Sequence, residues 1–264
     1  MAGPGPIALI TDFGWRDSYV AAMKGVLVSR ASPGARVLDL THEIALFDIF
    51  EGAWFLRTVA PFYPQGTIFV IVVDPGVGSS RRIVAAELDG RFYLAPDNGV
   101  LSLLGELERA VSVENEAFFL PHGSTTFHGR DRFAPVAAAL SNGTKIDELG
   151  PALHPNELVH LDYTPPRYDA DRVEGSIVAV DRFGNIVTDI EASRIGFSPF
   201  AVRVKYVLIE HLVANYAEGA KLSDADAFLV IGSGGLLEIS TAKGSASEVL
   251  HLKRFEVVEV MKRT

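Results

Sequence analysis

The chain has 264 residues, of which 48% are apolar, so it can bury a sizeable core and does not have the composition of a disordered protein. Acidic residues outnumber basic ones by 33 to 24, and the formal net charge of −9 argues against nucleic acid or an anionic membrane as a partner. The absence of cysteine excludes disulfides, thiolate zinc sites, iron–sulfur clusters and a cysteine nucleophile.

The first half of the chain alternates short apolar runs with helical patterns. The strands predicted there are Ile7–Thr11, Val37–Leu40 and Thr67–Val73, and the helices between them are Asp17–Arg30 and Phe47–Val59. Asp17 or Ser18 can cap the first of these helices.

The third strand is rich in β-branched residues and apolar on both faces, which is typical of the centre of a sheet flanked by helices. It also contains the longest apolar run, Ile68–Val73, which is far too short to span a membrane. No signal peptide is visible, and we therefore expect a cytoplasmic protein. Asp89-Gly90 predicts a hairpin between Arg82–Leu88 and Arg91–Leu94, and a further helix is expected over Asp131–Leu140.

The second half changes character near residues 165–172, where two prolines and a charged stretch interrupt the pattern. Beyond this point strands dominate, over Ser176–Val180, Ile186–Ile190, Val202–Ile209, Ala227–Ile231, Leu236–Thr241 and Phe255–Val260. The sequence therefore predicts a layered α/β domain over 1–168, with a mostly parallel central sheet, and a smaller, mainly β domain over 169–264.

Asp12 follows the first predicted strand and precedes Phe13-Gly14. Ligands of open α/β sheets bind outside the carboxyl ends of the strands, and a carboxylate there can accept two hydrogen bonds from a vicinal diol such as a ribose. The alternative is that Asp12 caps the following helix, for which Asp17 is the more natural residue.

Asp74 stands at the end of the third strand, in a turn that contains Gly76 and Gly78. Arg81 follows seven residues after Asp74 and can fold back over the turn to pair with the carboxylate. Such a pair is often a structural bridge, but the two glycines leave the carboxylate uncovered, which a structural bridge seldom needs.

His128 lies between an aromatic residue and Gly129, just before a predicted helix, and is well placed to be partly exposed in a cleft. A lone histidine is more often a packed or surface residue. With Asp12 and Asp74 it could form a two-carboxylate, one-histidine metal site, but no compact histidine spacing supports one.

Two loops of the second half also carry polar residues. Asp181-Arg-Phe-Gly-Asn185 lies between two predicted strands, and Ser233 lies in the loop Gly232-Ser-Gly-Gly235. Both have the composition of ordinary turns. The glycine-rich loop lacks the lysine of a phosphate-binding loop, so chemistry on nucleotide phosphates is not indicated.

The order of these motifs resembles the S-adenosyl-L-methionine hydroxide adenosyltransferase family, which is related to bacterial fluorinase and chlorinase. The resemblance covers nearly the whole chain and is carried by Ile10-Thr-Asp-Phe-Gly14, Tyr19-Val-Ala-Ala-Met-Lys-Gly25, Thr41-His-Glu43, Phe47-Asp-Ile, Glu51-Gly52, Val73-Asp-Pro-Gly-Val-Gly78, Ala95-Pro-Asp-Asn-Gly99, Thr126-Phe-His-Gly-Arg-Asp131, Phe133-Ala-Pro-Val136, Asp181-Arg-Phe-Gly-Asn185, Leu237-Glu-Ile239 and Gly244-Ser-Ala246.

The resemblance implies a homotrimer that hydrolyses S-adenosylmethionine to adenosine and methionine without a metal or other cofactor. It implies an N-terminal α/β domain and a barrel-like C-terminal domain, with the substrate held between the first domain of one subunit and the second domain of its neighbour. The residues that match the family's site are the water-positioning Asp74, Arg81 and His128, the ribose ligand Asp12, and Asp181, Asn185 and Ser233 for the methionine portion.

Two alternatives to a hydrolase are a halide adenosyltransferase and a protein that binds S-adenosylmethionine without turnover. The halogenating relatives carry tyrosine where this chain has Asp74, and in fluorinase a serine that helps hold the halide stands in the place of Gly129. A carboxylate at position 74 repels a halide and accepts a hydrogen bond from water, so the sequence favours hydrolysis.

Two positions depart from the resemblance. Ala242 stands where the family usually has asparagine, at a position expected near the adenine, and Gly232 stands where asparagine often precedes the loop serine. We therefore expect recognition of the base or of methionine to differ at these positions.

Overall fold

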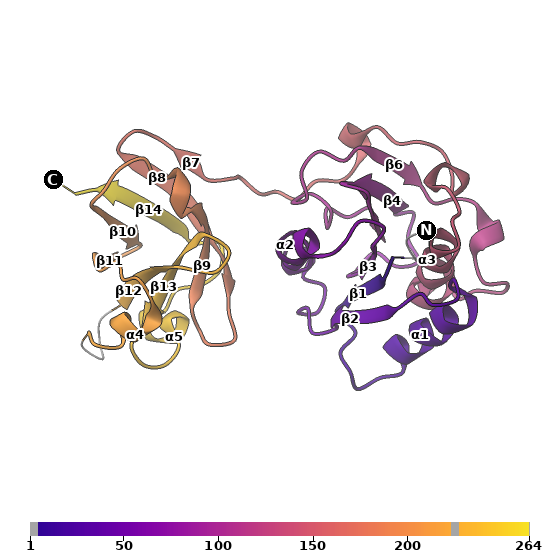
Figure 1. The fold of residues 1–264 in the computed structure, drawn as a ribbon, viewed down its shortest axis with the longest axis horizontal. Helices are drawn as coiled ribbons and strands as arrows, with labels where there is room; N and C mark the ends of the chain where they lie inside the picture. Colours follow the sequence, from indigo (N-terminus) through magenta and orange to yellow (C-terminus); the bar gives the residue numbers. More distant parts are fainter. Residues whose placement is uncertain (1–4, 223–226, 264) are drawn as a thin grey trace. The chain divides into compact units, whose positions relative to one another are not determined.

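The computed structural model describes residues 5–222 and 227–263, and it divides into two compact units between Asp162 and Tyr163 (Figure 1). The sequence placed this division between residues 168 and 169. Each unit is described by itself. In the described residues, no helix combines the length and the apolar character that crossing a membrane requires.

The first unit is built on a six-stranded sheet of order β2-β1-β3-β5-β4-β6. The strands are β1 (Ile7–Thr11), β2 (Val37–Thr41), β3 (Ile68–Val72), β4 (Ile83–Leu88), β5 (Arg91–Pro96) and β6 (Arg109–Ser112). β1 pairs in parallel with β2 and β3, and β3 pairs in parallel with β5, whereas β4 is antiparallel to β5 and to β6. The predicted α/β class is confirmed, with a mixed sheet in which the Asp89-Gly90 hairpin introduces the antiparallel pairs.

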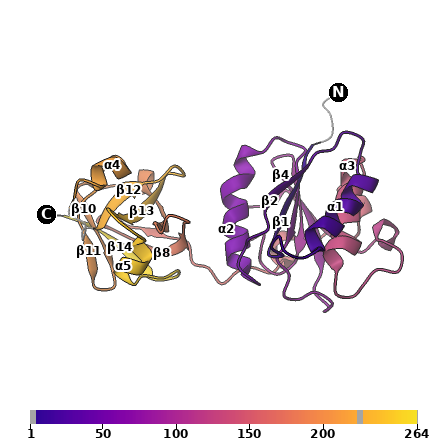
Figure 2. The same ribbon diagram turned by 90° about the horizontal axis from the view of Figure 1, so that it is seen from below.

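Helices cover both faces of this sheet. Figure 2 shows α2 (Ile49–Val59) on one face, and α1 (Tyr19–Arg30) and α3 (Ala134–Ser141) on the other. Alternate residues of β3 enter the two cores, since Val70 packs with α1 and α3 while Phe69 packs with α2. The predicted two-sided burial of this strand is therefore confirmed.

Three local expectations are corrected by the structure. Ser18 occupies the N-cap position of α1, but its side chain makes no capping hydrogen bond. The helix expected from Asp131 begins earlier, as a π-helical turn over Gly129–Phe133 that leads into α3. The strand expected over Val202–Ile209 is a hairpin of two strands, because the chain turns at Lys205, where φ is 51°.

The second unit is an eight-stranded antiparallel sheet that curls into a nearly closed barrel. Its main path runs β11-β10-β14-β8-β9-β13-β12, and β7 pairs with β8. Leu212, just after β11, forms a bridge with Leu229 of β12, which brings the two end strands together. The strands are β7 (Arg167–Tyr168), β8 (Arg172–Val180), β9 (Ile186–Glu191), β10 (Phe200–Val204), β11 (Val207–Ile209), β12 (Ala227–Ile231), β13 (Leu236–Thr241) and β14 (Val257–Lys262).

Short helices complete both units. The second unit contains α4 (Tyr216–Gly219) and α5 (Ala246–Leu250), and single 3-10 turns occur at Ala60–Phe62, Glu116–Phe118, Ile146–Glu148, Pro155–Glu157 and Ala192–Arg194. These elements are too short to give a periodic apolar pattern, and the sequence did not predict them.

Substitution of Phe69 tests how much the core of the first unit contributes to stability. The ring of Phe69 is fully buried, stacked on Tyr93 with centroids 5.2 Å apart and packed edge-on against Tyr63 at 5.5 Å. Phe69→Ala should lower the free energy of unfolding by about 3–5 kcal/mol because it leaves a cavity. Both tryptophans, Trp15 and Trp54, belong to this unit, so their fluorescence in a urea titration reports its unfolding.

The matched control is Val28→Ala, since Val28 is 77% exposed and should change stability by no more than about 0.5 kcal/mol. Equal effects of the two substitutions would contradict the assignment of Phe69 to the core.

Candidate active site

Two carboxylates lie at the same edge of the first sheet. Asp12 follows β1 and Asp74 follows β3, and these strands are parallel with Thr11 in register with Val72. Both side chains are buried, and so is His128, which corrects the expectations that the turn glycines leave Asp74 uncovered and that His128 is partly exposed. Burial raises the pKa of Asp12 above its usual value, the hydrogen bond from the Phe47 amide opposes this, and the charge of Asp74 raises it further. A carboxyl pair therefore lies at the carboxyl edge of the strands, where open α/β sheets bind ligands.

Arg81 folds back over the turn after β3 and joins Asp74 to His128. Its Nε donates to Oδ1 of Asp74 at 2.8 Å, and its Nη2 donates both to Oδ2 of Asp74 and, at 2.9 Å, to Nδ1 of His128. The two parallel bonds to Asp74 fix the plane of the carboxylate. Gly76 makes room for this fold, because a Cβ there would lie 3.2 Å from Cγ of Arg81.

The hydrogen bond from Arg81 sets the tautomer of His128. A guanidinium can only donate, so Nδ1 of His128 accepts and, in the neutral ring, Nε2 carries the proton. Burial lowers the pKa of His128, and the positive charges of Arg132 and Arg81 lower it further, against the opposing effects of Asp74 and Asp131. Near neutral pH the imidazole is therefore uncharged, with Nε2–H as a donor.

The three side chains together offer a defined set of donors and acceptors. Asp74 supplies carboxylate lone pairs, His128 supplies one N–H, and Arg81 holds the other two in place. Nη1 of Arg81 is buried and has no hydrogen-bond partner among the described residues. A water molecule that donates to Asp74 and accepts from His128 would be oriented at this point.

The loop that carries His128 is held by close packing. A Cβ on Gly129 would lie 3.0 Å from Sδ of Met23, so this position accepts a side chain only if its neighbour gives way. Gly78 has φ of +79°, and a Cβ on it would lie 2.8 Å from the carbonyl oxygen of Thr125. The turn after β3 and the loop before His128 thus touch through glycine backbone, which sets the distance between Arg81 and His128.

Exposed apolar side chains lie on the two loops that flank Asp12. Trp15, Leu46 and Phe47 are all more than half exposed, and the backbone N–H of Phe47 donates to Oδ2 of Asp12 at 2.9 Å. Phe47 adopts φ of 64°, an uncommon conformation for a bulky residue and one that recurs at functional sites. Sequence patterns gave no sign of this contact, because the backbone of Phe47 makes it.

The loop residues Asp181 and Asn185, in the second unit, organise their own turn. Asp181 accepts from the backbone amides of Phe183 and Asn185, and its Oδ2 accepts from the side-chain amide of Asn185 at 2.8 Å. Oδ1 of Asn185 in turn accepts from the hydroxyl of Ser240 at 2.8 Å. Ser233 is exposed, in the turn between β12 and β13.

Glu238 lies beside these loops and was not singled out from the sequence. Its Oε2 accepts from the hydroxyl of Tyr216 at 2.7 Å, and a Cβ on Gly232 would lie 1.8 Å from its Oε1. Burial raises the pKa of Glu238, the bond from Tyr216 opposes this, and the charge of Asp181 raises it further. Burial and Glu238 raise the pKa of Tyr216 to about 12.

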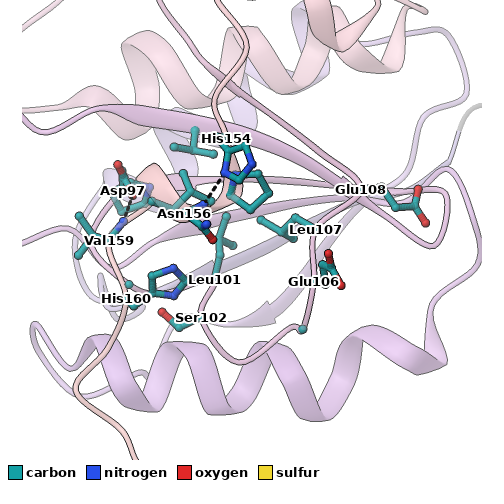
Figure 3. A pocket seen from close by; sticks show the side chains of 16 residues that line it. Asp97, Leu101, Ser102, Glu106, Leu107, Glu108, His154, Asn156, Val159 and His160 are labelled. Atoms are coloured by element: carbon teal, nitrogen blue, oxygen red, sulfur yellow. Dashed lines mark hydrogen bonds between the residues drawn. The ribbon is translucent and has the colours of Figure 1, made fainter.

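A cavity of about 590 Å³ lies elsewhere in the first unit, and its lining contains none of Asp74, Arg81 and His128 (Figure 3). Several of its polar groups are already satisfied, since Asp97 accepts from Arg82 and from the amide of Val159. No group of three or more histidine, aspartate or glutamate side chains within residues 5–222 and 227–263 is arranged to hold a metal ion. The candidate site is therefore the one built around Arg81.

Comparisons with known proteins cover almost the whole chain. Residues 7–150 match the family model of the SAM hydroxide adenosyltransferase N-terminal domain, and residues 175–259 match that of the C-terminal domain. The chain is 38% identical to an (R)-S-adenosyl-L-methionine hydrolase of Thermus thermophilus, over 94% of this chain and 96% of the relative. A fluorinase of an Actinoplanes species is 28% identical, over 97% of each chain. A crystal structure of an uncharacterized conserved protein from Thermotoga maritima superposes with a TM-score of 0.87 at 30% identity, over 97% of this chain and 100% of the other.

The electrostatics of His128 give a test of the site. Arg132→Gln should raise the pKa of His128 toward its ordinary value of 6.5, because one of the two like charges that lower it is removed. The titration of the ring followed by NMR measures this pKa. Arg132→Lys keeps the charge and should leave the pKa low. An unchanged pKa in Arg132→Gln would contradict the geometry.

Proposed function

The chain belongs to the SAM hydroxide adenosyltransferase family, and we propose that it hydrolyses S-adenosyl-L-methionine to adenosine and L-methionine, with water or hydroxide attacking the ribose C5′. The observation that carries the proposal is the single guanidinium of Arg81 that holds Asp74 and His128, at the sheet edge that also bears Asp12. The similarity to S-adenosylmethionine hydrolases supports it.

The chemistry needs an oriented nucleophile more than an acid. The O–C5′ bond forms as the C5′–S bond breaks, and the proton lost by the attacking water passes to solvent. Methionine leaves as a neutral thioether without protonation, so no general acid is required. Holding the oxygen in line with the carbon–sulfur bond can supply several kcal/mol, up to roughly 7–11 kcal/mol in well-oriented systems. We propose that the reaction uses no metal or other cofactor.

Each residue of the triad then has a role that follows from its hydrogen bonds. Asp74 accepts a hydrogen bond from the attacking water, and the Nε2–H of His128 donates to the oxygen, so that a lone pair is left to face C5′. Arg81 holds the carboxylate of Asp74 in a fixed plane through two hydrogen bonds. Asp12 accepts hydrogen bonds from the ribose diol, whose hydroxyls replace water around a carboxylate that burial disfavours.

Halide transfer is less well supported by the same residues. A halide ion would meet the negative charge of Asp74, and the position of Gly129 is crowded by Met23. The fluorinases are also more distant relatives than the hydrolases, at 28% against 38% identity for the two proteins named above.

We further propose that the enzyme is a homotrimer in which Asp181, Asn185 and Ser233 of a neighbouring subunit complete the site by holding the methionine portion. The exposure of Trp15, Leu46 and Phe47, on the two loops that flank Asp12, supports this, because large apolar side chains near a site are often covered by a partner.

Isotope labelling tests the reaction. Incubation with S-adenosylmethionine in ¹⁸O-labelled water should give adenosine that carries the label at O5′ together with unlabelled methionine, as measured by chromatography and mass spectrometry. Substrate binding without product on prolonged incubation would favour a binding protein, and added chloride or fluoride that yields a 5′-halogenated adenosine would favour halide transfer.

The labelling experiment is paired with Asp74→Asn. The amide keeps the size of the side chain but weakens the acceptor and adds a donor toward the water, so turnover should fall by about 100-fold or more while substrate affinity changes little. Unchanged turnover would remove Asp74 from the site.

Mixed trimers test the shared site. Asp74→Asn and Asp181→Asn, each inactive or weakly active alone, are mixed, dissociated and reassembled. If each site combines two subunits, about a quarter of the sites in a random mixture have both native residues, so activity should return to about that fraction. Mixed assemblies confirmed by mass spectrometry but lacking this recovery would show that the two residues act in different sites or in one subunit.

A further inference from the structure

A chain of hydrogen bonds runs behind Asp12, through the buried side chains of Thr11 and His42. Oγ1 of Thr11 lies 2.8 Å from Nδ1 of His42, and Nε2 of His42 lies 3.0 Å from Oδ1 of Asp39. Nζ of Lys24 donates to the other oxygen of Asp39 at 2.7 Å. Thr11 is 0% and His42 1% exposed, so the inner part of the chain is closed to water.

Every hydrogen in this chain has one consistent place. Asp39 as a carboxylate can only accept, so in the neutral ring of His42 Nε2 carries the proton and Nδ1 accepts from the hydroxyl of Thr11. Partial burial raises the pKa of Asp39, but the hydrogen bonds from His42 and Lys24 outweigh it and hold the pKa below its usual value. The hydroxyl of Thr11 also accepts from the backbone amide of Phe13 at 3.2 Å, and this completes its bonding.

Thr11, His42 and Asp39 follow one another in the order of a catalytic hydroxyl, its general base and the carboxylate that orients the base. The burial of Thr11 excludes it as a nucleophile. The hydroxyl of Thr11 has no exposed surface, and it donates to Nδ1 of His42, which is itself buried. What it does instead is fix the backbone on both sides of Asp12, because it belongs to the preceding residue and binds the amide of the following one, Phe13.

The loop after β2 holds the same segment from a second direction. The amide of Gly14 donates to the carbonyl oxygen of His42 at 2.7 Å, and the amide of Phe47 donates to Oδ2 of Asp12 at 2.9 Å. The ring of Trp15 packs edge-on against His42 with centroids 4.6 Å apart. His42 is therefore the point at which the loops after β1 and β2 are joined.

We propose that Thr11, His42 and Asp39 are positioning residues that hold Asp12 in the orientation required to bind a ligand with a vicinal diol. The inference rests on the proposed function, which makes Asp12 the ribose ligand. A buried carboxylate that is free to turn would lose binding energy to ordering, and a diol presents two hydroxyls at a fixed spacing. The hydrogen bonds through Thr11, His42 and Asp39 fix the orientation of Asp12 before the ligand binds.

The test compares two ligands that differ only in the diol. The affinities of adenosine and of 2′,3′-dideoxyadenosine are measured by calorimetry for the native enzyme, Thr11→Val and Thr11→Ser. Valine keeps the shape and removes the hydroxyl, so adenosine should bind about tenfold more weakly while dideoxyadenosine changes less than about twofold. Serine restores the hydroxyl and should restore adenosine binding.

A second variant changes Asp39, the hydrogen-bond partner of His42. Asp39→Asn leaves the site itself untouched and should give the same selective loss for adenosine, and KM for S-adenosylmethionine should rise more than kcat falls. The control is Asp147→Asn, which removes an exposed ion pair with Arg109 and should change neither affinity.

The outcomes separate this inference from the proposed reaction. Equal weakening of both ligands in Thr11→Val, or a native enzyme that does not prefer the diol, would overturn the positioning role. Selective loss of adenosine in an enzyme that releases no adenosine from S-adenosylmethionine would support the positioning role and refute the reaction instead.

Discussion

The site depends on the hydrogen bonds that the guanidinium of Arg81 makes to two other side chains. The guanidinium is shared between a carboxylate and an imidazole, and its two bonds to Asp74 and one to His128 leave each group a single orientation. Burying these charges is costly unless the geometry is good. That geometry requires Gly76 under the arginine stem and Gly78 against the loop before His128, so the glycines of the turn after β3 serve the pairing and do more than end a strand.

The same cation creates an asymmetry between the two carboxylates at the sheet edge. Arg81 compensates the charge of Asp74, whereas Asp12 has backbone contacts and keeps a raised pKa. An uncompensated pair would attract the sulfonium of the substrate and stabilise the ground state, which opposes a reaction that removes positive charge from sulfur. Neutralising Asp74 limits that effect and leaves its lone pairs available to water. In the proposed role of Asp12, its carboxylate acts on the ribose diol, where charge does not change during the reaction.

The sequence predicted those features that depend on local pattern. Alternating apolar runs gave the strands of the first sheet, and the resemblance named the triad whose members the structure brings together. The sequence did not predict contacts between residues that are far apart along the chain. Thr11 and His42 are 31 residues apart, and although Thr41-His-Glu43 is one of the motifs that carry the resemblance, the sequence gave His42 no role. The turn at Lys205 was missed because its left-handed backbone occurs at a residue that carries no glycine or asparagine signal.

The position of Glu238 gives a physical reason for glycine at position 232, where the resemblance leads one to expect asparagine. Oε1 of Glu238 lies where a side chain at position 232 would begin, and Tyr216 holds the other carboxylate oxygen. Asparagine at 232 would therefore require the end of the Glu238 side chain to shift, so we expect substitutions at the two positions to have non-additive effects on stability. With Asp181 close enough to raise the pKa of Glu238, a second carboxyl group on β13 lies beside the loops that the resemblance assigns to methionine. A ligand group that binds there with a positive charge relieves the repulsion between the two carboxylates, whereas a neutral one leaves it in place.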